Sequence, residues 1–286
     1  AIWSMVSASK PEYADRPEVV LYRAIASFSN GTIDKIKARV TALTQPTTDS
    51  ALWRAMLAVR ERDWTSASEQ FRQSMSRIGD YPDPYRTRLE LALIETALQT
   101  QDYVMAEGAL NRLSDRQRLV TRRLSPAAEY LTGALNWQEE KPDEARARFS
   151  SAAASRNQLW HVRAELALIE ADIKENRIDA AEAVKRLERL RFAWRGDALE
   201  YDIVYRLAGL RLQNGDFASA FEDYSKLAEK FSADPRTPGL AEEQRTAFTR
   251  IFEGDTRDKT PAYSQLAIWD RYPQFRPVDE VKLDDI

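Results

Sequence analysis

The sequence predicts an all-α protein that is built from repeated pairs of helices. Glycine and proline are scarce, with 9 and 12 copies in 286 residues, and no proline lies between Asp143 and Asp234. Apolar residues recur three or four positions apart, as is typical of helices and not of strands. The eight residues Arg88–Glu95 return almost unchanged as Arg163–Glu170, 75 positions later. That offset suits two helical hairpins, so the chain is expected to be an array of them.

A second repeated signal predicts where each hairpin turns. Five segments pair an aromatic, apolar or proline residue with an alanine three positions later: Trp64/Ala67, Tyr103/Ala106, Pro142/Ala145, Ile178/Ala181 and Phe217/Ala220. The alanines are 39, 39, 36 and 39 residues apart, and an aspartate often precedes the pair. Ile33 and Ile36 form an earlier, degenerate copy. We therefore predict a first helix, a tight turn and a second helix in each unit.

Breaks between hairpins are expected at a set of prolines, namely Pro46, Pro82, Pro84, Pro126 and Pro235. Ser125 followed by Pro126 is a typical helix start, because serine can cap free amides and proline is tolerated in the first turn. Pro142 opens a second helix in the same way. Gly215 can adopt the positive φ that ends a helix.

These residues resemble the tetratricopeptide repeat (TPR). The pattern of a turn glycine, an aromatic, an alanine and a further aromatic is matched by Gly215, Phe217, Ala220 and Tyr224. Further matches are Asp63, Trp64, Ala67 and Phe71 in the second copy, Gly133, Ala145 and Phe149 in the fourth, and Leu207 and Ala208 in the sixth. The spacing exceeds the usual length of about 34 residues, and Lys185 stands where the fifth copy should have an aromatic. The resemblance implies a right-handed superhelical solenoid whose first helices line a concave face.

The predicted organisation has three parts. Residues 1–17 form an N-terminal extension or the remnant of a preceding helix, with an apolar patch of Ile2, Trp3, Met5 and Val6. Residues 18–235 hold six TPR-like repeats. Residues 236–286 form a C-terminal helical cap with an extended acidic tail, in which helices are expected at 240–252 and 261–270 and extended chain from 272.

Composition argues against several classes of function. The chain has no cysteine and one histidine, His161, and its net charge of −3 is unlike the basic excess of nucleic-acid binders. No phosphate-binding loop, dinucleotide fingerprint or nucleophile elbow is present, and adjacent carboxylates on a helix diverge. No apolar run is long enough to cross a membrane. We therefore expect no catalytic residue, no metal ligand, no cofactor and no nucleic-acid partner.

One cluster of arginines allows two interpretations. Residues 112–123 include Arg112, Arg116, Arg118, Arg122 and Arg123. They could bind a phosphate or an acidic partner. The favoured interpretation is the charged end of a second helix, where cations offset the helix dipole.

The TPR resemblance implies a binding surface on the concave face. The residues expected to contact a partner are Arg88, Glu95, Tyr130, Trp137, Arg163, Glu170, Tyr205 and Gln213. Aromatic and arginine anchors among both charge signs suit an extended peptide or a helix. Packing against the adjacent first helix, or salt bridges within a repeat, would account for the same residues without a partner.

Three hypotheses for function remain open. The leading one is a non-catalytic scaffold that binds another protein or peptide. The second is a structural segment of a larger bacterial envelope assembly, with a flagellar-motor association as one form of it, or a homo-oligomer. It draws on the start at Ala1, on the apolar first residues and irregular C-terminal end, and on a short similarity of Leu190–Leu199 to large TPR-containing envelope proteins. The absence of cysteine favours an oxidising compartment such as the periplasm or envelope over the cytoplasm. The third is an enzyme with an unrecognised carboxylate site.

Overall fold

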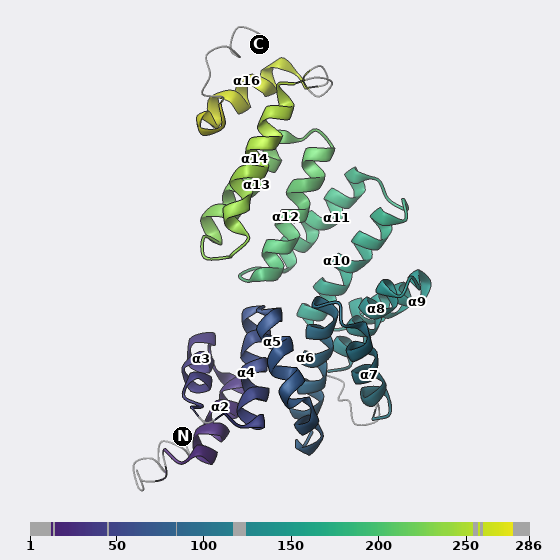
Figure 1. Ribbon diagram of the computed structural model, residues 1–286. Coiled ribbons are helices and arrows are strands. Elements are labelled where there is room, and N and C mark those ends of the chain that lie inside the picture. Colours follow the sequence, from purple (N-terminus) through teal and green to yellow (C-terminus); the bar gives the residue numbers. More distant parts are fainter. Residues whose placement is uncertain are drawn as a thin grey trace. The chain divides into compact units, whose positions relative to one another are not determined.

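The fold is all-α, as the sequence predicts, in a computed structural model of the chain (Figure 1). The structure describes residues 13–276 except 14, 45, 84, 117–123, 254–256 and 258–259. All regular structure in these residues is helical. The chain divides into two compact units, residues 1–157 and 158–286, each of which is described separately below.

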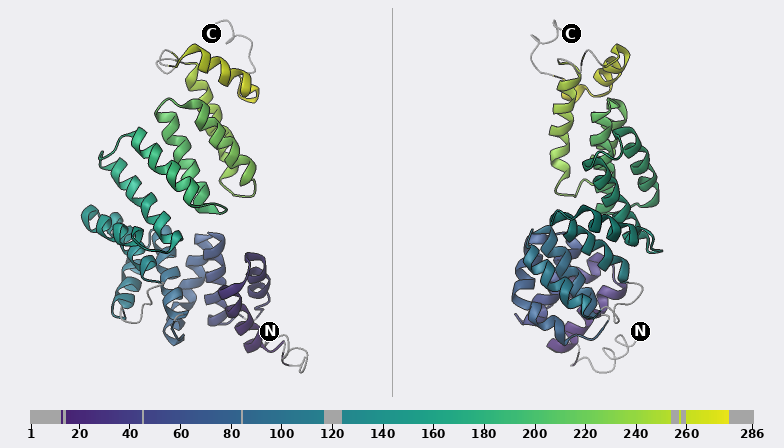
Figure 2. Two further views of the ribbon diagram at one scale, coloured as in Figure 1. Left: turned by 180° about the vertical axis from the view of Figure 1, so that it is seen from behind. Right: turned by 90° about the vertical axis from the view of Figure 1, so that its right-hand side faces the viewer.

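Unit 1 is a row of helical hairpins. Its helices are α2 (Pro17–Asn30), α3 (Ile33–Thr41), α4 (Thr48–Glu61), α5 (Trp64–Ser74), the 3₁₀ helix η2 (Met75–Asp80), α6 (Tyr85–Gln99), α7 (Tyr103–Ser114), α8 (Ser125–Gln138) and α9 (Pro142–Ala153). Consecutive helices pack as antiparallel pairs, and the first helices α2, α4, α6 and α8 also contact one another in that order (Figures 1 and 2). Neighbouring hairpins in this unit therefore bury their apolar faces against each other.

Unit 2 continues with two further hairpins and a capping segment. Its helices are α10 (Gln158–Lys174), α11 (Ala180–Ala193), α12 (Ala198–Gln213), α13 (Phe217–Lys230), α14 (Thr237–Ile251), α16 (Ala262–Arg271) and the 3₁₀ helix η4 (Pro273–Phe275). One core cluster joins α10, α11 and α12 around Ile169, Leu187 and Ile203. A second is aromatic and closes the end of the unit around Phe221 and Phe248.

Five of the six turns within hairpins share one backbone geometry, and the exception is the first, where Gly31 after α2 is extended at φ −93°. Each of the five has a residue in the left-handed region, at φ between 54° and 80°: Arg62, Gln101, Glu140, Asn176 and Gly215. The next amide donates to the carbonyl oxygen five residues back over 2.8–2.9 Å, as in Asp63 to Ala58. This pattern is the Schellman motif, which satisfies the last carbonyls of the first helix. Only one of the five positions is the glycine that favours this conformation.

Aspartates begin most of the second helices. The Asp63, Asp102, Asp179 and Asp216 carboxylates each accept a hydrogen bond from an amide in the first turn of the following helix. An amide in the first turn has no partner within the helix, so this capping stabilises the helix start. The fourth hairpin lacks the carboxylate, because Lys141 occupies the capping position before Pro142.

The turn of the fifth hairpin corrects the predicted repeat register. Helix α11 begins at Ala180, and its buried alanine is Ala183, whereas Ala181 is exposed. In the other four hairpins the second helix begins two residues after the left-handed residue, whereas here α11 begins four residues after Asn176. The predicted pair Ile178/Ala181 assumed the shorter spacing, so it lies two residues before the positions that it was meant to mark. Four positions after the buried Ala183 is the buried Leu187, which takes the place of the expected aromatic, whereas Lys185 does not.

Small residues let the two helices of a hairpin approach closely, as the sequence predicts. Gly133 of α8 is the clearest case. A Cβ atom at this position would lie 2.8 Å from the Phe149 ring and 3.1 Å from the Ala145 carbonyl oxygen of α9. Ala55 and Ala208 occupy the same place in the second and sixth copies and are fully buried.

The C-terminal region differs from the expected extended chain where it is described. Pro273–Phe275 is a 3₁₀ turn, and Phe275 is buried against Phe221 and Tyr272. Aromatic burial stabilises this turn against the core of the unit. The predicted apolar patch at Ile2–Val6 and the acidic residues after Pro277 lie outside the described residues.

Candidate functional site

The eight residues predicted to contact a partner all lie on the first helices of hairpins. Arg88 and Glu95 are on α6, and Tyr130 and Trp137 are on α8, so these four belong to unit 1. Arg163 and Glu170 are on α10, and Tyr205 and Gln213 are on α12, so the other four belong to unit 2.

In unit 1 the predicted residues are half-buried. Arg88, Glu95, Tyr130 and Trp137 each keep part of their surface exposed. The Tyr130 ring lies 5.7 Å from that of Phe149, so it packs on its own hairpin. These four positions offer polar and aromatic surface, whereas Leu91, which lies between Arg88 and Glu95 on α6, is buried in the core.

In unit 2 the predicted arginine and glutamate on α10 have separate partners. Glu170 pairs with Arg206 of α12 over 2.6 Å, which joins two hairpins. The Arg163 guanidinium lies 4.8 Å from the centre of the Trp160 ring. Glu170 therefore contributes to a contact between repeats, whereas the contact of Arg163 with Trp160 lies within α10.

Gln213 lines a groove in unit 2, and Tyr205 lies next to the groove, bonded to its lining residue Glu243. The groove lies between α12 and α14 over α13 and has a volume of about 530 Å³. Its apolar lining is Leu212, Phe217, Tyr224 and Ala247, and its polar lining includes Gln213, Glu242, Glu243, Thr246 and Arg250. The Tyr205 hydroxyl donates to the Glu243 carboxylate over 2.8 Å. We call this feature the α12–α14 groove.

Aromatic side chains surround Tyr205. Tyr205 is 38% exposed, and its ring packs between those of Tyr201 and Tyr224 at 6.0 and 6.1 Å. Burial raises the pKa of Tyr205 to about 12, and the bond to Glu243 acts in the same direction. Tyr205 is thus a neutral hydrogen-bond donor at physiological pH.

Arg236 contacts the aromatic and acidic residues that are next to Tyr205 on this surface. The Arg236 guanidinium lies 3.8 Å from the Tyr201 ring centre and pairs with Asp202 over 2.5 Å and with Asp234 over 2.8 Å. Hydrogen bonds to Asp234 raise the pKa of Arg236 further. The first-helix surface of unit 2 therefore alternates aromatic rings with satisfied charges, a composition found at protein-binding surfaces.

Unit 1 has a second groove, which the sequence did not predict. It has a volume of about 510 Å³ and lies between α2 and the start of α4, with Val20, Leu21 and Leu43 as apolar lining. Asp15, Glu18 and Asp49 line it as well. Nothing in the repeat pattern marks this place, because the lining comes from a helix end and an irregular connection.

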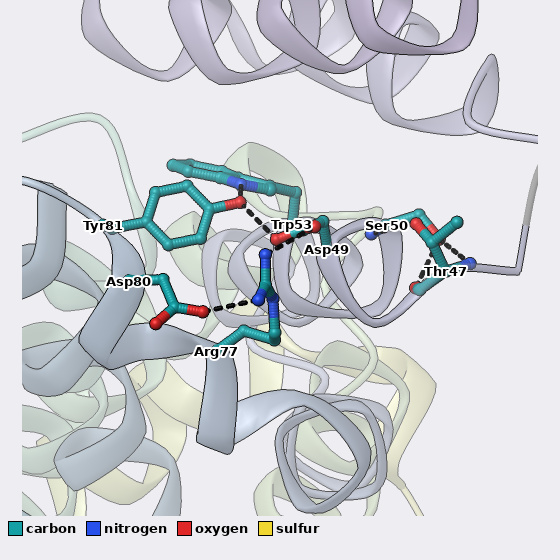
Figure 3. A network of polar contacts seen from close by, with 7 residues as sticks. All are labelled: Thr47, Asp49, Ser50, Trp53, Arg77, Asp80 and Tyr81. Atoms are coloured by element: carbon teal, nitrogen blue, oxygen red, sulfur yellow. Dashed lines mark hydrogen bonds and ion pairs between the residues drawn. The ribbon is translucent and has the colours of Figure 1, made fainter.

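A polar network fixes the wall of this groove (Figure 3). The Tyr81 hydroxyl donates to Asp49 over 2.9 Å and accepts from the Trp53 indole over 3.0 Å, and Arg77 bridges Asp49 and Asp80. Burial raises the pKa of Tyr81. These contacts tie η2 to α4, so Asp49 is committed to structure.

Residues considered for chemistry show no assembled site in the described part of the chain. No group of three His, Asp or Glu side chains there is placed to hold a metal ion. His161 is half-exposed on α10. Within the described residues, no helix has the length and apolar character that crossing a bilayer needs.

The arginine cluster at 112–123 is only partly described. Arg116 binds the buried Glu90 and pairs with Asp83 over 3.3 Å, so it has a structural role. Arg112 lies in the last turn of α7, as the helix-dipole interpretation expects. Arg118, Arg122 and Arg123 lie outside the described residues.

Comparison with known proteins adds no family assignment. No model of a known protein family matches the chain, and no curated protein matches its sequence. The functional interpretation therefore rests on the helical hairpins and on the surfaces described above.

Proposed function

We propose that this protein is a non-catalytic interaction scaffold, in which TPR-like hairpins stack into a right-handed superhelix and bind a partner peptide or helix along the first helices. The single observation that carries the proposal is the α12–α14 groove, whose lining combines apolar side chains with polar ones, including the predicted contact residue Gln213. Five hairpin turns of one geometry support the repeat character of the array.

The groove has the chemistry that a partner helix or extended segment needs. Apolar side chains of the partner would lose water against Phe217, Tyr224 and Ala247. Gln213 and Glu243 in the lining would set its orientation through hydrogen bonds, since such groups give specificity more than affinity. Tyr205 is the expected anchor, because tyrosines dominate the energetics of many interfaces.

The proposal is tested by crosslinking from within the groove. A photo-crosslinking amino acid at Gln213 is expected to capture a protein partner, and the same amino acid at the exposed Val104 of α7 serves as control. Adding Thr246→Glu, at an exposed residue of the lining, should weaken the crosslink strongly, because it places a charge beside the apolar surface of the groove. A partner captured equally from both positions, or unaffected by the added glutamate, would contradict the groove as the binding site.

A further inference from the structure

The segment Leu190–Leu199 contains a tightly bonded loop between α11 and α12. The Trp194 indole donates to the Asp197 carboxylate over 2.7 Å, and Asp197 also caps α12 by accepting from the Leu199 amide over 2.9 Å. Gly196, at φ +105°, donates its amide to Glu200. Glu200 in turn pairs with Lys230 of α13 over 2.6 Å. These bonds account for four residues of the segment, but not for Arg191, Phe192 and Arg195.

Those three residues form an exposed aromatic site flanked by cations. Phe192 is 66% exposed, and the guanidinium groups of Arg191 and Arg195 lie 5.3 and 5.7 Å from its ring centre. The attraction between the guanidinium groups and the ring holds the exposed Phe192 side chain in a defined position, where a partner can contact it. Because the loop is held by its own hydrogen bonds, a partner would meet a preorganised site.

A groove adjoins Phe192 on the face of the second helices. It has a volume of about 350 Å³ and lies between α11 and α13, with Val204, Leu227 and Phe231 as apolar lining. We call it the α11–α13 groove. The α12–α14 groove lies over α13, whereas this one has residues of α12 in its floor, so the two use different sides of the hairpin stack.

Charge in the α11–α13 groove is arranged by depth. Its cations are Arg191, Arg195, Lys226 and Lys230, and its acids are Glu200, Asp223 and Glu229. The Lys226 side chain is 60% exposed, whereas those of Glu200 and Asp223 are only 9% and 2% exposed. Asp223 is bound by Arg191 over 3.1 Å and by Arg211. At the rim, Lys226 pairs with the half-exposed Glu222 over 2.6 Å, and Glu229 is exposed. Arg195, beside Phe192, is also exposed and has no carboxylate partner among the described residues, so it is the cation that an approaching acidic chain can bind directly.

We propose that the α11–α13 groove docks an acidic segment of a partner protein, with an apolar side chain of that segment placed on Phe192. A carboxylate of the segment next to that apolar side chain pairs with Arg195 in charge-assisted hydrogen bonds. This interaction is additional to binding in the α12–α14 groove and uses none of its residues.

The test uses peptides as the probe. A random peptide library is selected on the full chain and counter-selected on the Phe192→Ser/Arg195→Glu double variant. The selected peptides are expected to be rich in Asp and Glu around one aromatic or aliphatic residue. Their affinity should fall at least about tenfold for Arg195→Glu alone and fall with rising salt.

Matched controls separate this site from general charge effects. Arg245→Glu on α14 reverses an equally exposed charge in the same unit, and Tyr263→Ser removes an exposed aromatic from α16. Neither should change the affinity by more than about twofold. Circular dichroism checks that every variant keeps its helical content.

The outcomes decide the proposal independently of the proposed function. Selection of basic or neutral peptides, peptides that bind the double variant equally well, or a preference for a single-stranded oligonucleotide over the acidic peptides would overturn it. Thr246→Glu in the α12–α14 groove should leave acidic-peptide affinity unchanged. If that variant abolishes peptide binding instead, both peptide classes share one site and the second groove is not separate.

Discussion

The same eight-residue motif occupies two different environments in the two units. On α6 the motif residue Glu90 is buried, with a side chain 1% exposed, whereas the matching Glu165 on α10 is 32% exposed. Glu90 binds Arg116 and, over 3.3 Å, Arg86, whereas Glu165 has a looser pair with Arg186 at 3.8 Å.

The two helices have different neighbours within their own units. Helix α6 contacts α4, α5, η2, α7 and α8 within unit 1, so hairpins cover it on both sides. Helix α10 is the first helix of unit 2 and packs within that unit on α11 and the core that it shares with α12. One local sequence thus serves as a buried ion-pair site in one unit and as half-exposed surface in the other.

The largest expected difference in the free energy of unfolding is between the variants Glu90→Ala and Glu165→Ala. Glu90→Ala leaves Arg116 and Arg86 without their buried carboxylate and should lower the free energy of unfolding by about 3–5 kcal/mol. Glu165→Ala should lower it by less than about 1 kcal/mol, because the pair is partly exposed. Urea unfolding of the full chain measures both. Equal losses would mean that the two motifs are equivalent after all.

A second comparison concerns one glycine in each unit. Gly133→Ala forces a Cβ atom against Phe149 and should cost about 1–3 kcal/mol of unfolding free energy. Gly209→Ala on α12 meets no atom within 4 Å and should stabilise by about 0.5–1 kcal/mol, since alanine favours the helix. Thermal unfolding of both variants gives the sign. A stabilising Gly133→Ala would show that the α8–α9 contact can relax.

The hairpin caps provide a smaller contrast. Asp102→Ala removes the carboxylate that accepts from the Met105 amide over 3.2 Å and should cost about 1 kcal/mol. Lys141→Asp supplies the missing cap to α9 and should stabilise by up to about 1 kcal/mol. Urea midpoints measured on both variants test the pair. An unchanged midpoint in Lys141→Asp would mean that Pro142 already defines the start of that helix.

The smallest expected effect is a difference in titration at Tyr205, which occupies the same position in its hairpin as Tyr130. Tyr130 and Tyr205 lie ten residues before the left-handed residue of their hairpins, and each packs on the aromatic residue of its own second helix. Tyr205 also donates to Glu243, and its pKa is raised to about 12.

Because the folded state favours the protonated phenol, the stability from this group is complete below the ordinary pKa of about 10 and is lost as the pH rises toward 12. Ultraviolet titration of tyrosinate should lose a late step in Tyr205→Phe. In Glu243→Gln the same step should move to lower pH, because the carboxylate that opposes ionisation is gone. An unchanged curve in both variants would contradict the assignment.

Much of the local structure could be predicted from the sequence, because it depends on short-range rules. The turns at Trp64, Tyr103, Pro142 and Phe217 begin helices where the pattern places them. The prediction for the fifth turn was wrong, since an inserted pair of residues shifts α11 without changing the periodicity of α10. The predicted binding residues were placed correctly on first helices, but their contacts, such as Glu170 with Arg206, depend on the neighbouring hairpin.

By itself, the sequence determined that the chain is helical, where most hairpins turn and which small residues lie between helices, because periodicity, capping and backbone preference act over a few residues. Tertiary structure alone decided that Glu90 is buried and Glu165 is not. It also formed both grooves of unit 2 and left Phe192 exposed between two arginines. Burial and charge neutralisation depend on atoms from helices distant in sequence, and no local pattern records which of them will meet.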